Sequence, residues 1–181
     1  MESAYIPAGP TTGLSDEHLF RLGEMAVYAA QLEFEIARNT SELVSVDQSV
    51  GDAVIAGLPF SRMLALARSI VEAKLPDNSR ARGAFAASVG LAVDAMNGRN
   101  RLLHGNWVAM GLPNEPILMR RGKPKTQIEY NVTFDQIERA TAKLVEAAEA
   151  VASAYFAAFM ELERTSVGGL SVVPGHGFQV E

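Results

Sequence analysis

Four long segments of the chain space their apolar residues as one face of an α-helix requires. They cover residues 15–43, 61–75, 79–104 and 133–163. Each segment has to bury its apolar face against another element, and helices joined by short connections do this as a bundle. A chain of 181 residues is long enough for one such domain with a full core. The sequence therefore predicts a mainly all-α protein, a four-helix bundle.

Capping and breaking residues mark the ends of these helices. Ser15 is a typical N-cap, and Pro76-Asp77-Asn78 ends one helix and starts the next. Thr133 and Gln136 have the spacing of a capping box. Residues 47–59 are rich in glycine and proline and predict a connection, with or without a turn of helix.

The segment between the third and last long helices has a different pattern. Residues 106–132 contain short apolar runs separated by glycine, proline and asparagine, which predicts a small inserted β-meander. The expected organisation is thus a flexible leader over 1–14, one helical domain over 15–163 and a tail over 164–181.

Composition limits the classes of protein and site. An apolar share of 48% is too high for a disordered chain. The absence of cysteine excludes disulfides, thiolate metal sites and cysteine nucleophiles, and fits a reducing cytoplasm. Residues 1–5 lack the basic start and apolar run of a signal peptide. No stretch of about 18 apolar residues is free of charge. We therefore expect a cytoplasmic protein without a membrane span.

The segment 79–104 is apolar on two sides. On a helical wheel, one stripe is expected to face the core and the opposite side is also apolar. The first stripe contains Leu91, Ala95, Gly98 and Leu102, and the second contains Val89, Val93, Met96, Asn100 and His104. Such a helix is either central in its own bundle or packed against a second subunit. We favour a homodimer through the Val89, Val93 and Met96 face.

Three residues at the end of that helix suit phosphodiester chemistry. Asn100 and His104 are spaced i, i+4, and Arg99 lies about 140° from His104 around the helix. Histidine exchanges protons near neutral pH, so it can act on a ribose 2′-hydroxyl or a leaving oxygen. Arginine binds phosphate oxygens and stabilises charge that develops in a transition state. Asparagine can orient the histidine ring or donate to phosphate.

The sequence Arg99-Asn100-x3-His104 resembles the Rx4-6H signature of HEPN domains. The resemblance implies a bundle of four or five helices and a dimer that brings two motifs together. It also implies a metal-independent endoribonuclease, possessing no cofactor, that leaves a 2′,3′-cyclic phosphate. His104 would be the general acid and base, Arg99 the transition-state stabiliser and Asn100 the positioning group. A defence or toxin-like role, with an antitoxin or another protein partner, belongs to the same expectation.

Basic residues follow the motif in an otherwise acidic protein. Residues 99–125 include six basic residues and one acidic residue, although the net charge of the whole chain is −5. Beyond the motif's Arg99, the candidates for RNA contacts are Arg101, Arg120, Arg121, Lys123 and Lys125. An equally good interpretation is that the four basic residues of the expected hairpin keep an edge strand soluble and contact no RNA.

Each of these features also has a purely structural interpretation. His104 before Gly105 is a natural C-terminal cap, and Trp107 is more typical of a core anchor than of a base-stacking platform. His18 is expected at the surface in the first turn of its helix. Three scattered histidines predict no metal site. The alternative function is a non-catalytic helical module that dimerises and binds a protein or a nucleotide.

Overall fold

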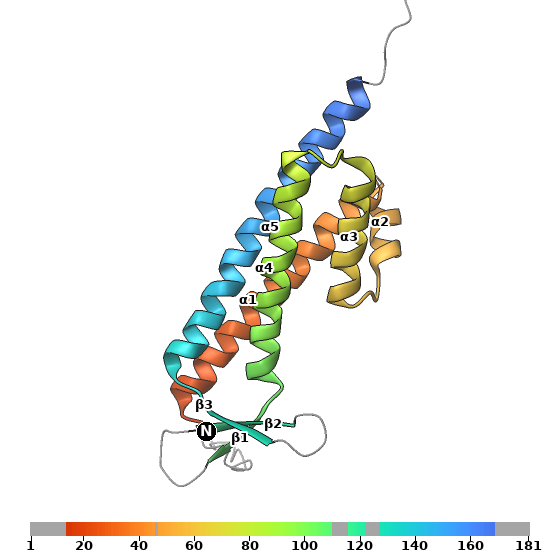
Figure 1. Ribbon diagram of the computed structural model, residues 1–181. Coiled ribbons are helices and arrows are strands. Elements are labelled where there is room, and N and C mark those ends of the chain that lie inside the picture. Colours follow the sequence, from red (N-terminus) through yellow and green to blue (C-terminus); the bar gives the residue numbers. More distant parts are fainter. Residues whose placement is uncertain (1–13, 46, 110–115, 122–126, 169–181) are drawn as a thin grey trace, which may run out of the picture.

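The structure, a computed structural model, describes residues 14–45, 47–109, 116–121 and 127–168 (Figure 1). Five helices and three short strands make up this part of the chain. The helices are α1 (Asp16–Val44), α2 (Gln48–Ile55), α3 (Phe60–Lys74), α4 (Arg80–Leu103) and α5 (Phe134–Gly168). The strands are β1 (Asn106–Ala109), β2 (Pro116–Arg121) and β3 (Gln127–Asn131). The expected helical bundle is confirmed.

The long helices α1, α4 and α5 run side by side, and α2 and α3 pack beside one end of them (Figure 1). The buried core lies mainly between the long helices and takes Met25, Leu32 and Ile36 from α1. From α5 it takes Ile137, Leu144 and Val151, which keep the spacing of a single helical face. Arg21 adds an ion pair with Glu138 across the α1–α5 contact.

The predicted helix starts are confirmed by their hydrogen bonds. The Ser15 side chain accepts from the His18 backbone N–H and caps α1. Before α5, the Gln136 side chain accepts from the Thr133 backbone N–H, which is one half of the predicted capping box. Helix α5 continues to Gly168, five residues beyond the predicted end at 163.

The region 47–59 holds a full helix rather than a turn, so the expectation of four helices was one short. The Asp47 side chain caps α2 by accepting from the N–H groups of Ser49 and Val50. Gly51 allows α2 to approach α1, because an added Cβ would overlap the Ser41 carbonyl. Ser41 Oγ also bonds Asp52 Oδ1 at 2.7 Å. Sequence reasoning missed α2 because eight residues give little periodicity.

The predicted faces of the helix 79–104 need correction. Leu91 is 41% exposed, whereas Met96 is 4% exposed and belongs to the core. The buried stripe of α4 consists largely of small side chains, including Ser88, Ala92 and Ala95. The wheel took Leu91 as the centre of the core-facing stripe, but small residues fill the core where helices approach closely. The predicted dimer face keeps Val93, which is exposed, and the half-buried Val89.

In the chain, the three strands follow α4 and precede α5. They form one sheet in the order β1-β2-β3, and both neighbouring pairs are antiparallel. Trp107 pairs with Leu118, and Leu118 with Tyr130. The strands lie at the end of the bundle where α1 and α5 begin (Figure 1).

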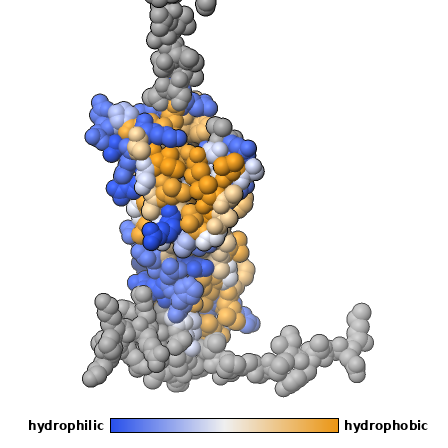
Figure 2. Space-filling view, turned by 90° about the vertical axis from the view of Figure 1, so that its right-hand side faces the viewer, coloured by the Kyte–Doolittle hydropathy of each residue, from blue (hydrophilic) through white to orange (hydrophobic). Residues whose placement is uncertain are grey.

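Apolar side chains gather over the upper part of the face that α2 and α3 occupy, above a hydrophilic region (Figure 2). Val50 and Val54 of α2 are about half exposed. Exposed aromatic residues also occur on α1 and α5, among them Phe20, Phe34 and Phe156. Within the part of the chain that the structure describes, no helix combines the length and the apolar character that a membrane crossing needs.

Candidate functional site

The end of α4 brings Arg99, Asn100 and His104 together at the surface. Arg99 Nη1 donates to Asn100 Oδ1 at 2.8 Å and lies 3.5 Å from His104 Nε2, the outer limit of a hydrogen bond. Asn100 and His104 are exposed, and Arg99 is half-buried. The three predicted site residues therefore form one cluster.

His104 is the residue at which α4 ends. Its φ of −101° and ψ of 8° make it the C-cap residue of α4, and its N–H donates to the Asn100 carbonyl at 3.1 Å. On a regular helix Arg99 and His104 would diverge by about 140°. The Arg99 guanidinium nevertheless comes within 3.5 Å of His104 Nε2. The predicted capping role of His104 is confirmed, and it coexists with the contact to Arg99.

Arg99 lies at the border between the core and the surface. Its position continues the buried stripe of α4, and its Nε is buried without a hydrogen-bond partner among the described residues. The described residues also give it no acidic partner. A guanidinium carries five N–H donors, so one that lacks a carboxylate retains donors for an anion.

Trp107 fixes the turn that follows the motif. Its Nε1 donates to the Leu102 carbonyl at 3.0 Å, and the half-buried ring packs against the core. Carbonyls in the last turn of a helix lack an intrahelical partner, and the indole supplies one here. The prediction that Trp107 is a core anchor is confirmed.

His18 is a core residue, which corrects its expected surface position. It is 2% exposed, its Nδ1 lies 2.7 Å from Ser15 Oγ, and its ring centroid lies 4.3 Å from that of Phe134. Burial lowers the pKa of His18, and the negative charge of Glu17 opposes this in part. Polarity suggested exposure, but the rings of Trp107 and Phe134 cover the imidazole.

A groove between α4 and α5 lies next to the motif. It has a volume of about 290 Å³, and Ala95, Gly98 and Ala140 leave space in its lining. Three basic side chains, Arg101, Arg139 and Lys143, line it together with Asp94 and Gln136. Among the described residues Arg101 and Lys143 form no ion pair. The groove therefore carries two positive charges in excess of its one acidic residue.

Of the five predicted RNA-contacting residues, only Arg101 is placed in a described site. Arg120 and Arg121 are in β2, where the structure describes the backbone alone, and Lys123 and Lys125 lie outside the described residues. Arg139 and Lys143 were missed by sequence reasoning. They are four residues apart on α5, but only the packing of α4 on α5 shows that they face Arg101.

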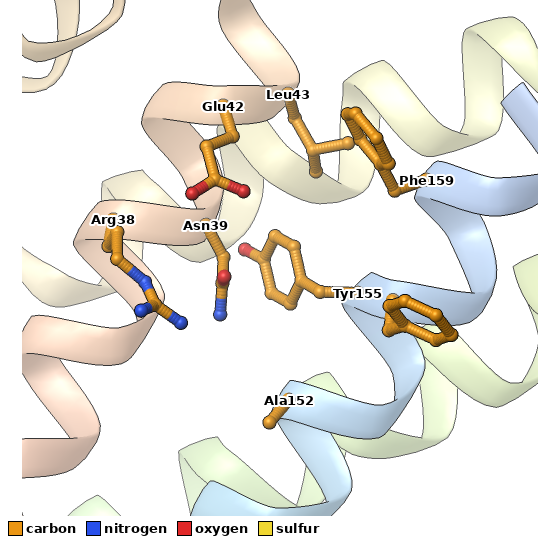
Figure 3. Close-up of a pocket in the computed structure, with 8 residues that line it drawn as sticks. Arg38, Asn39, Glu42, Leu43, Ala152, Tyr155 and Phe159 are labelled. Atoms are coloured by element: carbon orange, nitrogen blue, oxygen red, sulfur yellow. The ribbon is translucent and has the colours of Figure 1, made fainter. Parts of the chain in front are cut away.

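A second cavity lies between α1 and α5 near their other ends, with a volume of about 240 Å³ (Figure 3). Asn39 extends into the space between Arg38 and Tyr155, and its Nδ2 is buried without a partner among the described residues. Phe156 and Phe159 contribute aromatic walls. The cavity thus combines aromatic walls with one unpartnered amide donor.

The described residues contain no group of three histidine, aspartate or glutamate side chains that could hold a metal ion. No protein-family model, curated protein or solved structure matches the chain. The resemblance to HEPN domains rests on the motif and the helical bundle.

Proposed function

We propose that the protein is a metal-independent endoribonuclease of the HEPN type, with its active site at the end of α4. The observation that carries the proposal is the contact of Arg99 with both Asn100 and His104 at an exposed helix end. A cation, an amide and an imidazole within one cluster provide the groups needed to cleave RNA through its own 2′-hydroxyl.

In the proposed reaction, His104 takes the proton of the 2′-hydroxyl while the 2′-oxygen attacks the adjacent phosphorus. The bond from phosphorus to the 5′-oxygen then breaks, and that oxygen receives the proton from His104. The products carry a 2′,3′-cyclic phosphate and a 5′-hydroxyl. His104 Nε2 lies 3.5 Å from Arg99 Nη1, so the imidazole and the guanidinium can reach the same phosphate.

Arg99 stabilises the negative charge that accumulates on the phosphate oxygens in the transition state. Its Nε is buried without a partner among the described residues, and such a donor costs about 1–3 kcal/mol. A phosphate oxygen that reached Nε would remove this cost. Asn100 holds the guanidinium through Oδ1, so we assign it a positioning role.

The α4–α5 groove is proposed to hold the RNA backbone beside the cluster. Arg101, Arg139 and Lys143 provide cationic groups on one side of α4, and a single strand contacts such groups through successive phosphates. This accounts for RNA binding by a protein whose net charge is −5, because the positive charge is local.

Cleavage of end-labelled RNA in EDTA tests the assignment. Wild type is expected to cleave, and His104→Ala and Arg99→Ala to lose at least about 100-fold in rate, the usual contribution of a general acid–base group. Asn97→Ala is the matched control because Asn97 is exposed one turn before Asn100. Cleavage that survives His104→Ala, or that Asn97→Ala abolishes equally, refutes the assignment.

The second candidate is a non-catalytic helical binding module. The unpartnered Asn39 Nδ2 in the α1–α5 cavity favours it, because a buried donor in a cavity calls for a ligand acceptor. The two candidates differ in one readout. A binding module leaves RNA intact in EDTA, whatever residue stands at position 104.

A further inference from the structure

The cavity between α1 and α5 has a charged side and an aromatic side. Arg38, Asn39 and Glu42 line it from α1, and Phe156 and Phe159 line it from α5. Phe156 is 68% exposed and Phe159 37%, so both rings keep surface that the core does not cover. The cavity volume of about 240 Å³ is below the range of about 300–1,000 Å³ that drug-sized ligands occupy. The lining therefore fits a small molecule with a polar end towards α1 and an aromatic ring towards α5.

Asn39 locates the polar end of such a ligand. It is 8% exposed, and its Nδ2 has no hydrogen-bond partner among the described residues. Figure 3 shows its amide extending into the space between Arg38 and Tyr155. Buried donors are almost always bonded, so this one calls for an acceptor, and the exposed Arg38 beside it can shift to admit one. A carboxylate would offer one oxygen to Asn39 Nδ2 and the other to the Arg38 guanidinium.

Arg38 and Glu42 leave room for a ligand that carries both charges. They are four residues apart on α1, a spacing at which ion pairs often form. The ion pairs of the described residues include none between these two, and Arg38 Nη2 instead donates to Glu35 Oε2 at 2.8 Å. A ligand with a carboxylate alone would meet the two carboxylates of Glu35 and Glu42 beside one guanidinium. A ligand that also carries an ammonium group gives Glu42 a partner.

An α-amino acid has both groups on one carbon. Arg38 and Glu42 are about 6 Å apart along the axis of α1 at the helical rise per residue. With one hydrogen bond at each end, a carboxylate and an ammonium group on the same carbon span this distance. The side chain of the amino acid is then left to reach α5. An aromatic side chain is favoured there, because rings pair well with the rings of Phe156 and Phe159.

We infer that the α1–α5 cavity binds a free aromatic α-amino acid. The carboxylate of the ligand accepts from Asn39 and Arg38, and its ammonium group donates to Glu42. Its ring packs against Phe156 and Phe159. The inference does not depend on the proposed cleavage, because the cavity shares no residue with the cluster at the end of α4. The binding assay contains no RNA, so either proposal can fail alone.

Isothermal titration calorimetry at neutral pH with a matched set of probes tests the class of ligand. L-Phenylalanine is expected to bind with a Kd of about 10 µM to 1 mM. Of its analogues, 3-phenylpropionate lacks the ammonium group, phenethylamine lacks the carboxylate and L-alanine lacks the ring. Each is expected to bind at least about tenfold more weakly. No binding of L-phenylalanine at about 10 mM, or an analogue that binds as tightly, overturns the inference.

Two variants test the contacts. Asn39→Leu is expected to weaken L-phenylalanine binding at least about tenfold without lowering the thermal midpoint of the ligand-free protein, because Nδ2 bonds no described residue. Glu42 is exposed, so Glu42→Gln tests the site at a position that folding does not depend on. This variant is expected to weaken the binding of L-phenylalanine and to leave that of 3-phenylpropionate unchanged.

Glu24→Gln is the matched control, since Glu24 is an exposed glutamate of α1 outside the cavity. Its affinity for L-phenylalanine is expected to equal that of wild type. Unchanged affinity in Asn39→Leu or in Glu42→Gln, or an equal loss of affinity in Glu24→Gln, overturns the inference.

Discussion

Trp107 Nε1 donates a hydrogen bond to the backbone carbonyl of Leu102, at 3.0 Å across the last turn of α4. The bond spans the segment that contains His104. The position of the imidazole next to Arg99 therefore depends on a side chain outside the motif, and on the start of the strand that follows.

Trp107→Phe is expected to lower the free energy of unfolding by about 1–2 kcal/mol. The substitution keeps an aromatic ring against the core but leaves the Leu102 carbonyl without the indole donor. Urea unfolding followed by circular dichroism measures the change, since the chain has no second tryptophan for fluorescence. Unfolding at the wild-type midpoint would show that the hydrogen bond does not stabilise the turn.

His18 predicts a loss of stability in mild acid. Burial lowers its pKa in the folded state below the ordinary value of 6.5. The unfolded chain therefore binds a proton first as the pH falls, and the free energy of unfolding decreases from about pH 6.5 downwards until the folded pKa is passed. His18→Gln is expected to reduce this slope. Equal slopes for both proteins in urea unfolding at pH 7.5 and 5.5 would contradict the prediction.

The four long helices were predictable from the sequence because long apolar periodicity and capping residues are local signals. The Ser15 cap and the Thr133–Gln136 pair appear where they were expected. The phase of α4 and the burial of His18 were not predictable in this way. Both depend on which neighbouring element covers a given side chain. Small residues such as Ala92 do not indicate on a helical wheel which face of the helix is buried.

The candidate site likewise contains residues that the sequence could identify and residues that only the packing of the helices identifies. Arg99, Asn100 and His104 could be selected from residue type and spacing, but the contacts of Arg99 with Asn100 and His104 are visible only in the structure. Arg139 and Lys143 had no signal of their own in the sequence. They become candidates only because α5 packs against α4 at the level of Arg101.

The buried hydroxyl pair between α1 and α5 predicts an alkaline transition. Thr40 Oγ1 donates to the Ile36 carbonyl at 2.6 Å, so the Tyr155 hydroxyl donates to Thr40 at 2.9 Å. Burial raises the pKa of Tyr155 to about 12. The unfolded tyrosine ionises near pH 10, so the folded state loses up to about 3 kcal/mol between pH 10 and 12.

Tyr155→Phe is the control for that transition. At pH 7 it is expected to cost about 1 kcal/mol through the lost hydrogen bond. Between pH 10 and 12 its stability should fall less steeply than that of wild type, so the two curves converge. Parallel curves in urea unfolding would show that Tyr155 ionises as readily in the folded protein as in the unfolded one.

The α4–α5 groove predicts a change in the salt dependence of RNA binding. Arg139→Ala and Lys143→Ala are each expected to reduce the slope of log K against log salt by about 0.7, the value for one phosphate contact of a single strand. Fluorescence anisotropy with a labelled RNA from 50 to 300 mM salt measures the slope. Lys74→Ala is the control, since Lys74 is an exposed base at the end of α3. An equal loss of slope in Lys74→Ala would show that the groove has no special part.

The central claim is that Arg99 and His104 cleave RNA through its own 2′-hydroxyl without a metal. The direct measurement is analysis of the products formed by wild type in EDTA from an end-labelled RNA and from the same strand with 2′-deoxy sugars. The account predicts a 2′,3′-cyclic phosphate and a 5′-hydroxyl from the RNA, no cleavage of the deoxy strand, and loss of the products in His104→Ala. Cleavage of the deoxy strand, products with a 5′-phosphate, or intact RNA in every case would contradict it.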